Sequence, residues 1–154
     1  MNAAAAALVL APALALGSFL NVVVARVPAR RSILRPASSC GTCSTEILWR
    51  DNIPVLSYVV LRGRCRHCDA RISPLYPAVE LVSAGLIVTC FAVFGATAWA
   101  VLAAGSCAVL VTLSAIDLRH RIVPNRIVVP LLALGAVAAL FFGDAILDAT
   151  LTLV

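Results

Sequence analysis

Charged residues divide this chain into long apolar runs and short polar connections. Residues 3–25 carry no charge, and residues 81–116 form a second uncharged run. With a rise of ~1.5 Å per residue, a helix over the first run would cross a hydrocarbon core of ~30 Å. The second run is long enough for two short spans, which the turn-forming sequence Gly95-Ala-Thr97 separates. The pattern therefore predicts membrane-spanning helices.

The apolar pattern continues to the end of the sequence. We expect a further span over residues 127–143, with Pro130 in its first turn, where proline is tolerated. Asp144 and Asp148 then open another apolar stretch, which reaches Val154 without a helix-stop signal. We therefore expect an all-α integral membrane protein with about four transmembrane helices, the start of a fifth, and an interruption within that last span. The expected helices cover residues 1–25, 78–95, 98–116 and 127–143.

The first apolar run has a second interpretation, as a signal peptide that is later removed. Small residues at Ala11-Pro-Ala13 resemble a cleavage site. A signal peptide, however, carries positive residues before its apolar stretch, and here the arginines follow it. We therefore interpret residues 1–25 as a transmembrane anchor.

Composition supports a bilayer environment. The sequence is 62% hydrophobic and 12% charged, and its mean hydropathy is +1.05. An average soluble chain has about 25% charged residues. These values exclude intrinsic disorder and a soluble enzyme with a solvated surface.

The distribution of positive charge predicts the orientation in the membrane. All 12 basic residues are arginines; nine lie between Arg26 and Arg71, and three lie within residues 119–126. Because cytoplasmic connections are rich in positive charge, residues 26–76 and 117–126 are expected in the cytoplasm and the N-terminus outside. A nucleic-acid-binding protein would spread its basic residues over a folded face, which argues against that function.

Four cysteines form two pairs in the first cytoplasmic segment. Cys40-Gly-Thr-Cys43 and Cys65-Arg-His-Cys68 are separated by 21 residues, just beyond the usual spacing of roughly 15–20 residues for a zinc ribbon. Two such pairs can complete a tetrahedral zinc site, and disulfides are disfavoured in the cytoplasm. We expect a structural zinc ion that orders residues 26–76, because a closed four-cysteine site has no open position for chemistry.

Other interpretations of the cysteines stay open. The pairs could be redox-active or free thiols, and His67 could replace one ligand. Arg64 and Arg66 flank the second pair and are expected to lower the pKa of its thiols. Cys90 and Cys107 lie within expected spans, and we interpret them as small packing residues.

Asp117 is the main candidate for catalytic chemistry. It lies at the cytoplasmic end of an apolar run, where a carboxylate is costly if it faces lipid. One interpretation is an interfacial residue paired with Arg119 or Arg121, and another is a catalytic carboxylate. An aspartyl protease requires two carboxylates that share one proton, so Asp117 would need a partner.

Few acidic residues can serve as that partner. Asp144 and Asp148 follow a span of ~25 Å and are expected on the other side of the membrane. Asp51 and Asp69 belong to the cysteine segment. Glu80 is the nearest candidate, and we interpret it as a polar support or interfacial residue rather than half of a catalytic pair.

Several motifs occur together in a recognisable order. They are Gly17-Ser-Phe-Leu-Asn21, the two cysteine pairs, Asp51-Asn-Ile-Pro-Val-Leu-Ser-Tyr58, Ser73-Pro-Leu-Tyr-Pro-Ala-Val-Glu-Leu81, and Asp117-Leu-Arg119 with Pro124-Asn125. In this arrangement, residues 14–130 resemble the prepilin peptidases, the type IV leader peptidase family of membrane aspartyl proteases.

The resemblance implies an enzyme of the bacterial inner membrane. Its members cut the basic leader from type IV prepilins and pseudopilins at the cytoplasmic face, and many then methylate the new N-terminus with S-adenosylmethionine. By this resemblance, Asp117 is the first catalytic aspartate, and the zinc ligands are Cys40, Cys43, Cys65 and Cys68. Residues 77–154 would then form the first part of the peptidase domain.

One motif of the family is missing from the sequence. The second aspartate of the family lies in a GxGDxK motif, and Gly143-Asp144-Ala145 has only the central dipeptide. The alternative is therefore a zinc-ordered membrane adaptor without catalysis, or a vestigial peptidase.

We predict that residues 1–154 alone do not cleave a prepilin, because they lack the GxGDxK motif that would supply the second catalytic aspartate. The test is to incubate this chain with a prepilin in detergent and to look for the cleaved leader by mass spectrometry. Cleavage that Asp117→Ala abolishes would refute the prediction.

Overall fold

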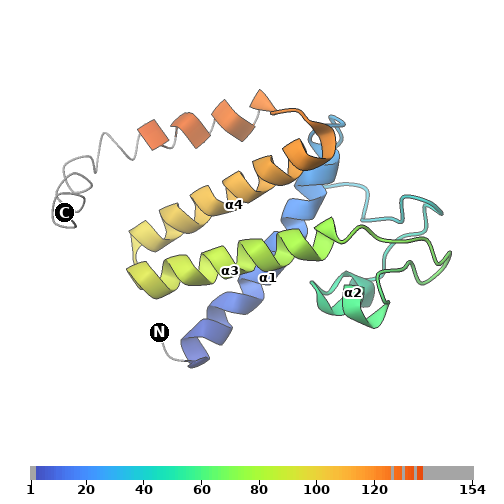
Figure 1. Ribbon diagram of the computed structural model, residues 1–154, viewed down its shortest axis with the longest axis horizontal. Helices are drawn as coiled ribbons and strands as arrows, with labels where there is room; N and C mark the ends of the chain where they lie inside the picture. The colour runs from blue at the N-terminus through green and yellow to red at the C-terminus, as the bar shows by residue number, and fades with distance from the viewer. Residues whose placement is uncertain (1–2, 126, 130, 134, 137–154) are drawn as a thin grey trace. The chain divides into compact units, whose positions relative to one another are not determined.

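The described part of the chain is mostly helical. The computed structural model describes residues 3–125, 127–129, 131–133 and 135–136. The helices are α1 (Ala3–Arg26), the 3-10 helix η1 (Trp49–Asn52), α2 (Leu56–Val60), α3 (Leu75–Phe94) and α4 (Ala98–His120) (Figure 1). Among the described residues, β structure is limited to two isolated bridges. The prediction of an all-α protein is confirmed.

Three helices are long and apolar enough to cross a membrane: Ala6–Arg26, Leu75–Phe94 and Ala98–His120. They agree with the first three predicted spans, so the chain is a multi-pass membrane protein. Of the predicted fourth span, residues 127–129, 131–133 and 135–136 are helical. The remainder of that span and the expected fifth helix lie outside the described residues. Residues 123–154 form a separate unit, whereas the three spanning helices and the cysteine segment belong to the unit of residues 1–122.

The hairpin between α3 and α4 follows the predicted break. Gly95 ends α3 with φ 66°, a left-handed conformation that glycine adopts without a steric penalty. The Thr97 side chain then caps α4 by accepting the N–H of Ala100 at 3.4 Å. This short connection makes the two helices antiparallel, so the start of α3 and the end of α4 lie on the same side (Figure 1).

Both helices extend further than the apolar pattern predicted. α3 begins at Leu75 rather than residue 78, because Pro74 has φ −65° and is already suited to a helix start. α4 continues through Asp117 to His120 rather than ending at residue 116. Arg119 and His120 in its last turn complement the negative end of the helix dipole.

Small residues form the contact between the spanning helices. Ala13 on α1, Ala84 on α3 and Ala104 on α4 are buried in one cluster with Ile87 and Cys90. Such residues allow helix backbones to approach closely, which is how helices associate where lipid removes the hydrophobic driving force. α1 crosses α3 in this arrangement (Figure 1). The interpretation of Cys90 as a packing residue is confirmed.

Gly17 lies where α1 packs tightly against α3. A Cβ atom at this position would lie 2.5 Å from Ser83 Oγ and 2.8 Å from Glu80 Cα. One turn further along α1, Asn21 Nδ2 donates to the backbone carbonyl of Tyr76 at 2.9 Å. The motif Gly17-Ser-Phe-Leu-Asn21 therefore combines a close packing point with a polar link between the helices.

We predict that Gly17→Ala destabilises the helix contact by about 1–3 kcal/mol, because the added methyl group overlaps atoms of α3. Thermal unfolding in detergent measures this loss. Gly85→Ala is the matched control, since a Cβ at Gly85 meets nothing within 4 Å. Equal unfolding temperatures for both variants would contradict the prediction.

Candidate functional site

The two cysteine pairs adopt the same backbone fold. In each, the first cysteine donates its N–H to the carbonyl five residues later, and the N–H four residues later donates back to the cysteine carbonyl. These bonds join Cys40 with Thr45 and Ser44 at 2.9 Å each, and Cys65 with Ala70 and Asp69 at 2.9 and 3.0 Å. Ser44 and Asp69 have matching φ values of 57° and 58°. The two pairs are therefore equivalent knuckles.

The knuckles bring four thiols together. The Sγ atoms of Cys40, Cys43, Cys65 and Cys68 all lie within 4.8 Å of one another. Cys40 Sγ and Cys68 Sγ are 3.8 Å apart, which matches the ~3.8 Å edge of a tetrahedron with Zn–S bonds of ~2.3 Å. These four residues can hold a metal ion, and the predicted convergence of the two pairs is confirmed.

Backbone and hydroxyl groups favour the thiolate form in the first knuckle. The pKa of Cys40 is lowered to about 6 by hydrogen bonds from the backbone of Cys43 and Thr42. The Thr45 side chain likewise lowers the pKa of Cys43. The backbone of Ala70 lowers the pKa of Cys68, but its thiol neighbours and desolvation outweigh this and raise it to about 12. Cysteine binds a metal ion as the thiolate. Four closely spaced thiols are therefore suited to bind one cation together.

Arg64 and Arg66 do not act on the thiols as predicted. Arg64 pairs with Asp69 at 2.6 Å, and Arg66 pairs with Asp51. The pKa shifts of Cys40, Cys43 and Cys68 come from hydrogen bonds and desolvation, and the two guanidinium charges are directed at carboxylates. For Cys68, whose pKa is raised, the prediction that these arginines lower it is wrong.

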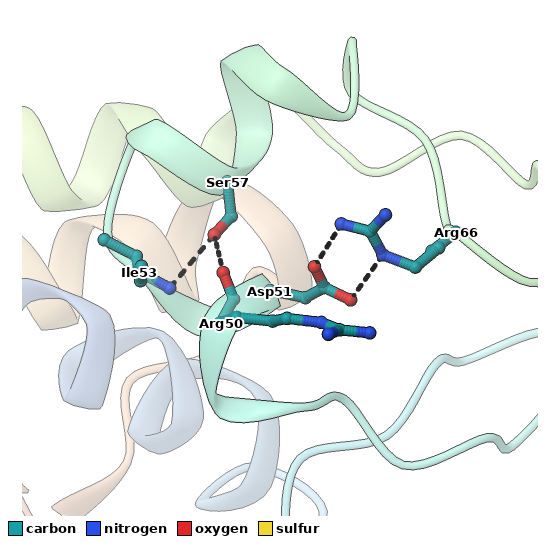
Figure 2. A network of polar contacts seen from close by, with 5 residues as sticks. All are labelled: Arg50, Asp51, Ile53, Ser57 and Arg66. Atoms are coloured by element: carbon teal, nitrogen blue, oxygen red, sulfur yellow. Dashed lines mark hydrogen bonds and ion pairs between the residues drawn. The ribbon is translucent and has the colours of Figure 1, made fainter.

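A polar network joins the second knuckle to η1 and α2 (Figure 2). Arg66 donates through Nε and Nη2 to the two carboxylate oxygens of Asp51, at 2.8 and 2.6 Å. This hydrogen bonding lowers the pKa of Asp51. The hydroxyl of Ser57 donates to the Arg50 carbonyl and accepts the Ile53 N–H, both at 3.0 Å. The segment between the knuckles is therefore ordered by side chains rather than by an apolar core.

Glu80 connects this segment to the spanning helices. Its side chain is buried on α3, and Oε2 accepts the backbone N–H of Val55 at 2.7 Å. Oε1 lies 3.5 Å from Asn21 Nδ2 on α1. Val55 has φ 60°, a strained value for a β-branched residue. The interpretation of Glu80 as a polar support is confirmed, although the sequence did not reveal its backbone partner.

Asp117 is exposed on the last turn of α4. In the described part of the chain, no ion pair joins it to Arg119 or Arg121, so the ion-paired interpretation is wrong. Arg119 instead lies over the Tyr76 ring, 5.6 Å from its centroid, with Nη1 3.4 Å from the hydroxyl. This contact holds the end of α4 against the start of α3.

A cavity of about 660 Å³ separates the knuckles from the helix ends. Its walls include Asn21, Tyr76, Glu80 and Arg119 from the helices and Cys40 from the first knuckle. Asp117 is not among the described residues that line it. The cysteine cluster, the buried carboxylate of Glu80 and the last turn of α4 nevertheless lie at one end of the helices.

Two families match this chain. Residues 12–94 match the family described as the bacterial peptidase A24 N-terminal domain, and residues 104–154 match the type IV leader peptidase family. No solved structure matches the chain.

Several curated proteins are similar to this chain. A prepilin leader peptidase/N-methyltransferase of Myxococcus xanthus (strain DK1622) is 46% identical over 137 residues, which cover 88% of this chain and 41% of that protein. Proteins with the same name from Burkholderia pseudomallei (strain 1026b) and Bacillus subtilis (strain 168) are 38% and 35% identical over 147 and 127 residues. These matches cover 79% and 82% of this chain, and 48% and 51% of those proteins. The chain therefore spans about half the length of the curated relatives it matches.

We predict that Cys40→Ser removes a bound divalent metal ion, because three thiolates and a hydroxyl no longer form the four-sulfur site. Elemental analysis of the purified protein measures the metal content. Cys107→Ser is the control, since Cys107 lies in α4 and outside the cluster. Unchanged metal content in Cys40→Ser would show that the cluster is not the binding site.

Proposed function

Because this chain belongs to the peptidase A24 family of type IV leader peptidases, we propose that it takes part in processing type IV prepilins. The reaction is removal of the leader from a prepilin or pseudopilin at the cytoplasmic face of the bacterial inner membrane. N-methylation of the new N-terminus, with S-adenosylmethionine as methyl donor, is the second proposed activity. It rests on the names of the similar proteins, which are called prepilin leader peptidase/N-methyltransferase.

The observation that carries the proposal is the exposed carboxylate of Asp117 on the last turn of a membrane-spanning helix. Prepilin cleavage at a membrane face requires a carboxylate at that level. The contact of Arg119 with Tyr76 gives the last turn of α4 a defined position beside α3. The apolar segment of the substrate would then lie along the helices, with its scissile peptide bond beside Asp117.

The orientation follows from charge. Residues 26–76 contain nine arginines, and the hairpin at residues 95–97 contains none. We infer that the knuckles and Asp117 face the cytoplasm and that the N-terminus lies outside. The substrate leader would therefore remain on the side of the metal site.

The proposed mechanism needs two carboxylates. One accepts a proton from the attacking water, and the other donates a proton to the departing amide nitrogen. Asp117 supplies the first carboxylate. By the family resemblance, the second belongs to a GxGDxK motif, which the 154 residues do not contain.

We further propose that the metal ion is Zn²⁺ and that its role is structural. Cys40, Cys43, Cys65 and Cys68 would hold it, and four thiolates leave no position for water or substrate. When bound, the ion supplies a cross-link between the two knuckles. We therefore assign the proton transfers of peptide cleavage to carboxylates and not to the metal site.

We predict that Asp117→Asn in the full-length gene product reduces prepilin cleavage by about 100- to 10,000-fold, because an amide cannot exchange the proton. The rate of leader release, followed by gel electrophoresis, measures the loss.

Asp144→Asn serves as the control, because that aspartate is expected on the opposite side of the membrane. An unaltered rate in Asp117→Asn would exclude its proposed role. A protein that binds prepilin but never cuts it would instead favour the zinc-ordered adaptor.

A further inference from the structure

The helix α2 presents an exposed apolar face outside the spanning helices. Leu56, Val59 and Val60 are spaced as i, i+3 and i+4, so they share one side of the helix. Their exposed fractions are 55%, 65% and 65%. Ser57, in contrast, is buried and hydrogen-bonds η1. α2 is therefore amphipathic, with its apolar side turned away from the protein.

Two further exposed apolar residues lie at the start of η1, the element that precedes α2 in the chain. Trp49 is 81% exposed, and Leu48 immediately before η1 is also exposed. The Ser57 hydroxyl holds η1 and α2 together by bonding Arg50 and Ile53 (Figure 2). We use the name η1–α2 surface for Leu48, Trp49, Leu56, Val59 and Val60.

The bond from Val55 to Glu80 sets the level of this surface relative to the membrane. Glu80 lies five residues into α3, or ~7.5 Å from the start of the helix. The 20 residues of α3 are ~30 Å long, close to the thickness of the hydrocarbon core. Val55 precedes α2 directly, so α2 begins near the level of Glu80, within the first two turns of α3. A side chain that faces outward from the helices at this level would meet lipid near the edge of the hydrocarbon core.

The surrounding charges favour anionic lipid. Arg50, next to Trp49 in the chain, and Arg62, two residues after α2, are both exposed, and the acid Asp51 is paired with Arg66. Residues 26–76 as a whole carry nine arginines and three acids. Basic residues at the cytoplasmic leaflet are attracted to anionic headgroups, and tryptophan is enriched at this interface.

We propose that the η1–α2 surface lies in the interfacial layer of the bilayer as an amphipathic anchor, bound by anionic phospholipid. The segment between the knuckles is then held from two sides, by Glu80 within the protein and by lipid outside it. The metal-binding loop is thereby pressed against the membrane instead of projecting into the cytoplasm. The anchor requires the membrane-spanning helices and the proposed orientation, and it is independent of the proposed peptidase activity.

Tryptophan fluorescence tests the anchor. The full-length protein with its metal is reconstituted in vesicles that contain phosphatidylglycerol, with or without phospholipids brominated near the top of the acyl chains. The contribution of Trp49 is the emission that disappears in Trp49→Phe. We expect the brominated lipid to quench most of this emission and aqueous acrylamide to quench little of it.

A charge substitution tests the α2 face. Val59→Asp is expected to decrease quenching of Trp49 by brominated lipid and to increase quenching by acrylamide, because a carboxylate on that face opposes burial in lipid. Ala37→Asp, at an exposed position before the first knuckle, is the matched control and should change neither value. Retained metal content shows that the loop of each variant is folded.

Two results would overturn the proposal, and both come from the unsubstituted protein. Trp49 emission that acrylamide quenches and brominated lipid does not would place the surface in water. Emission shielded from both quenchers would mean that protein covers the surface. The Trp49 result stands even if Val59→Asp fails to fold.

Discussion

The hydrogen bonds of the buried Glu80 carboxylate hold the cysteine segment and the helices α1 and α3 together. A carboxylate taken out of water must be hydrogen-bonded, and its bonds come from Val55 in the cysteine segment and Asn21 on α1. One side chain thus joins three parts of the chain that are far apart in sequence. The close approach at Gly17 makes this possible, because a larger residue there would separate α1 from α3.

The segment between α1 and α3 obtains its structure in a different way from the helices. The spanning helices pack through small residues, whereas η1 has no buried residue and α2 has only Ser57. Order in this segment comes from the four thiols, the pair of Asp51 with Arg66, and the bonds of Ser57. A metal ion that binds only the folded form would contribute its binding free energy directly to folding. The order of this segment therefore depends on its polar contacts, and a bound ion would add to them.

The candidate catalytic residue Asp117 and the cysteine knuckles lie at the same end of the helices because of the chain topology. The turn at Gly95 makes α3 and α4 antiparallel, so the end of α4 returns to the start of α3. The contact of Arg119 with Tyr76 holds this end together. Asp117 and the knuckles consequently belong to the same side of the membrane, as the processing of a membrane-inserted substrate would require.

The sequence alone determined the spanning helices, the hairpin break and the two cysteine pairs. Each depends on local properties: uncharged length, a glycine beside a capping threonine, or a fixed spacing of thiols. Only the tertiary structure decided that Arg64 and Arg66 pair with Asp69 and Asp51, and that Val55 is the partner of Glu80. Which carboxylate each arginine pairs with depends on distances between folded segments. A backbone N–H is present at nearly every residue, so the sequence does not indicate which one Glu80 accepts.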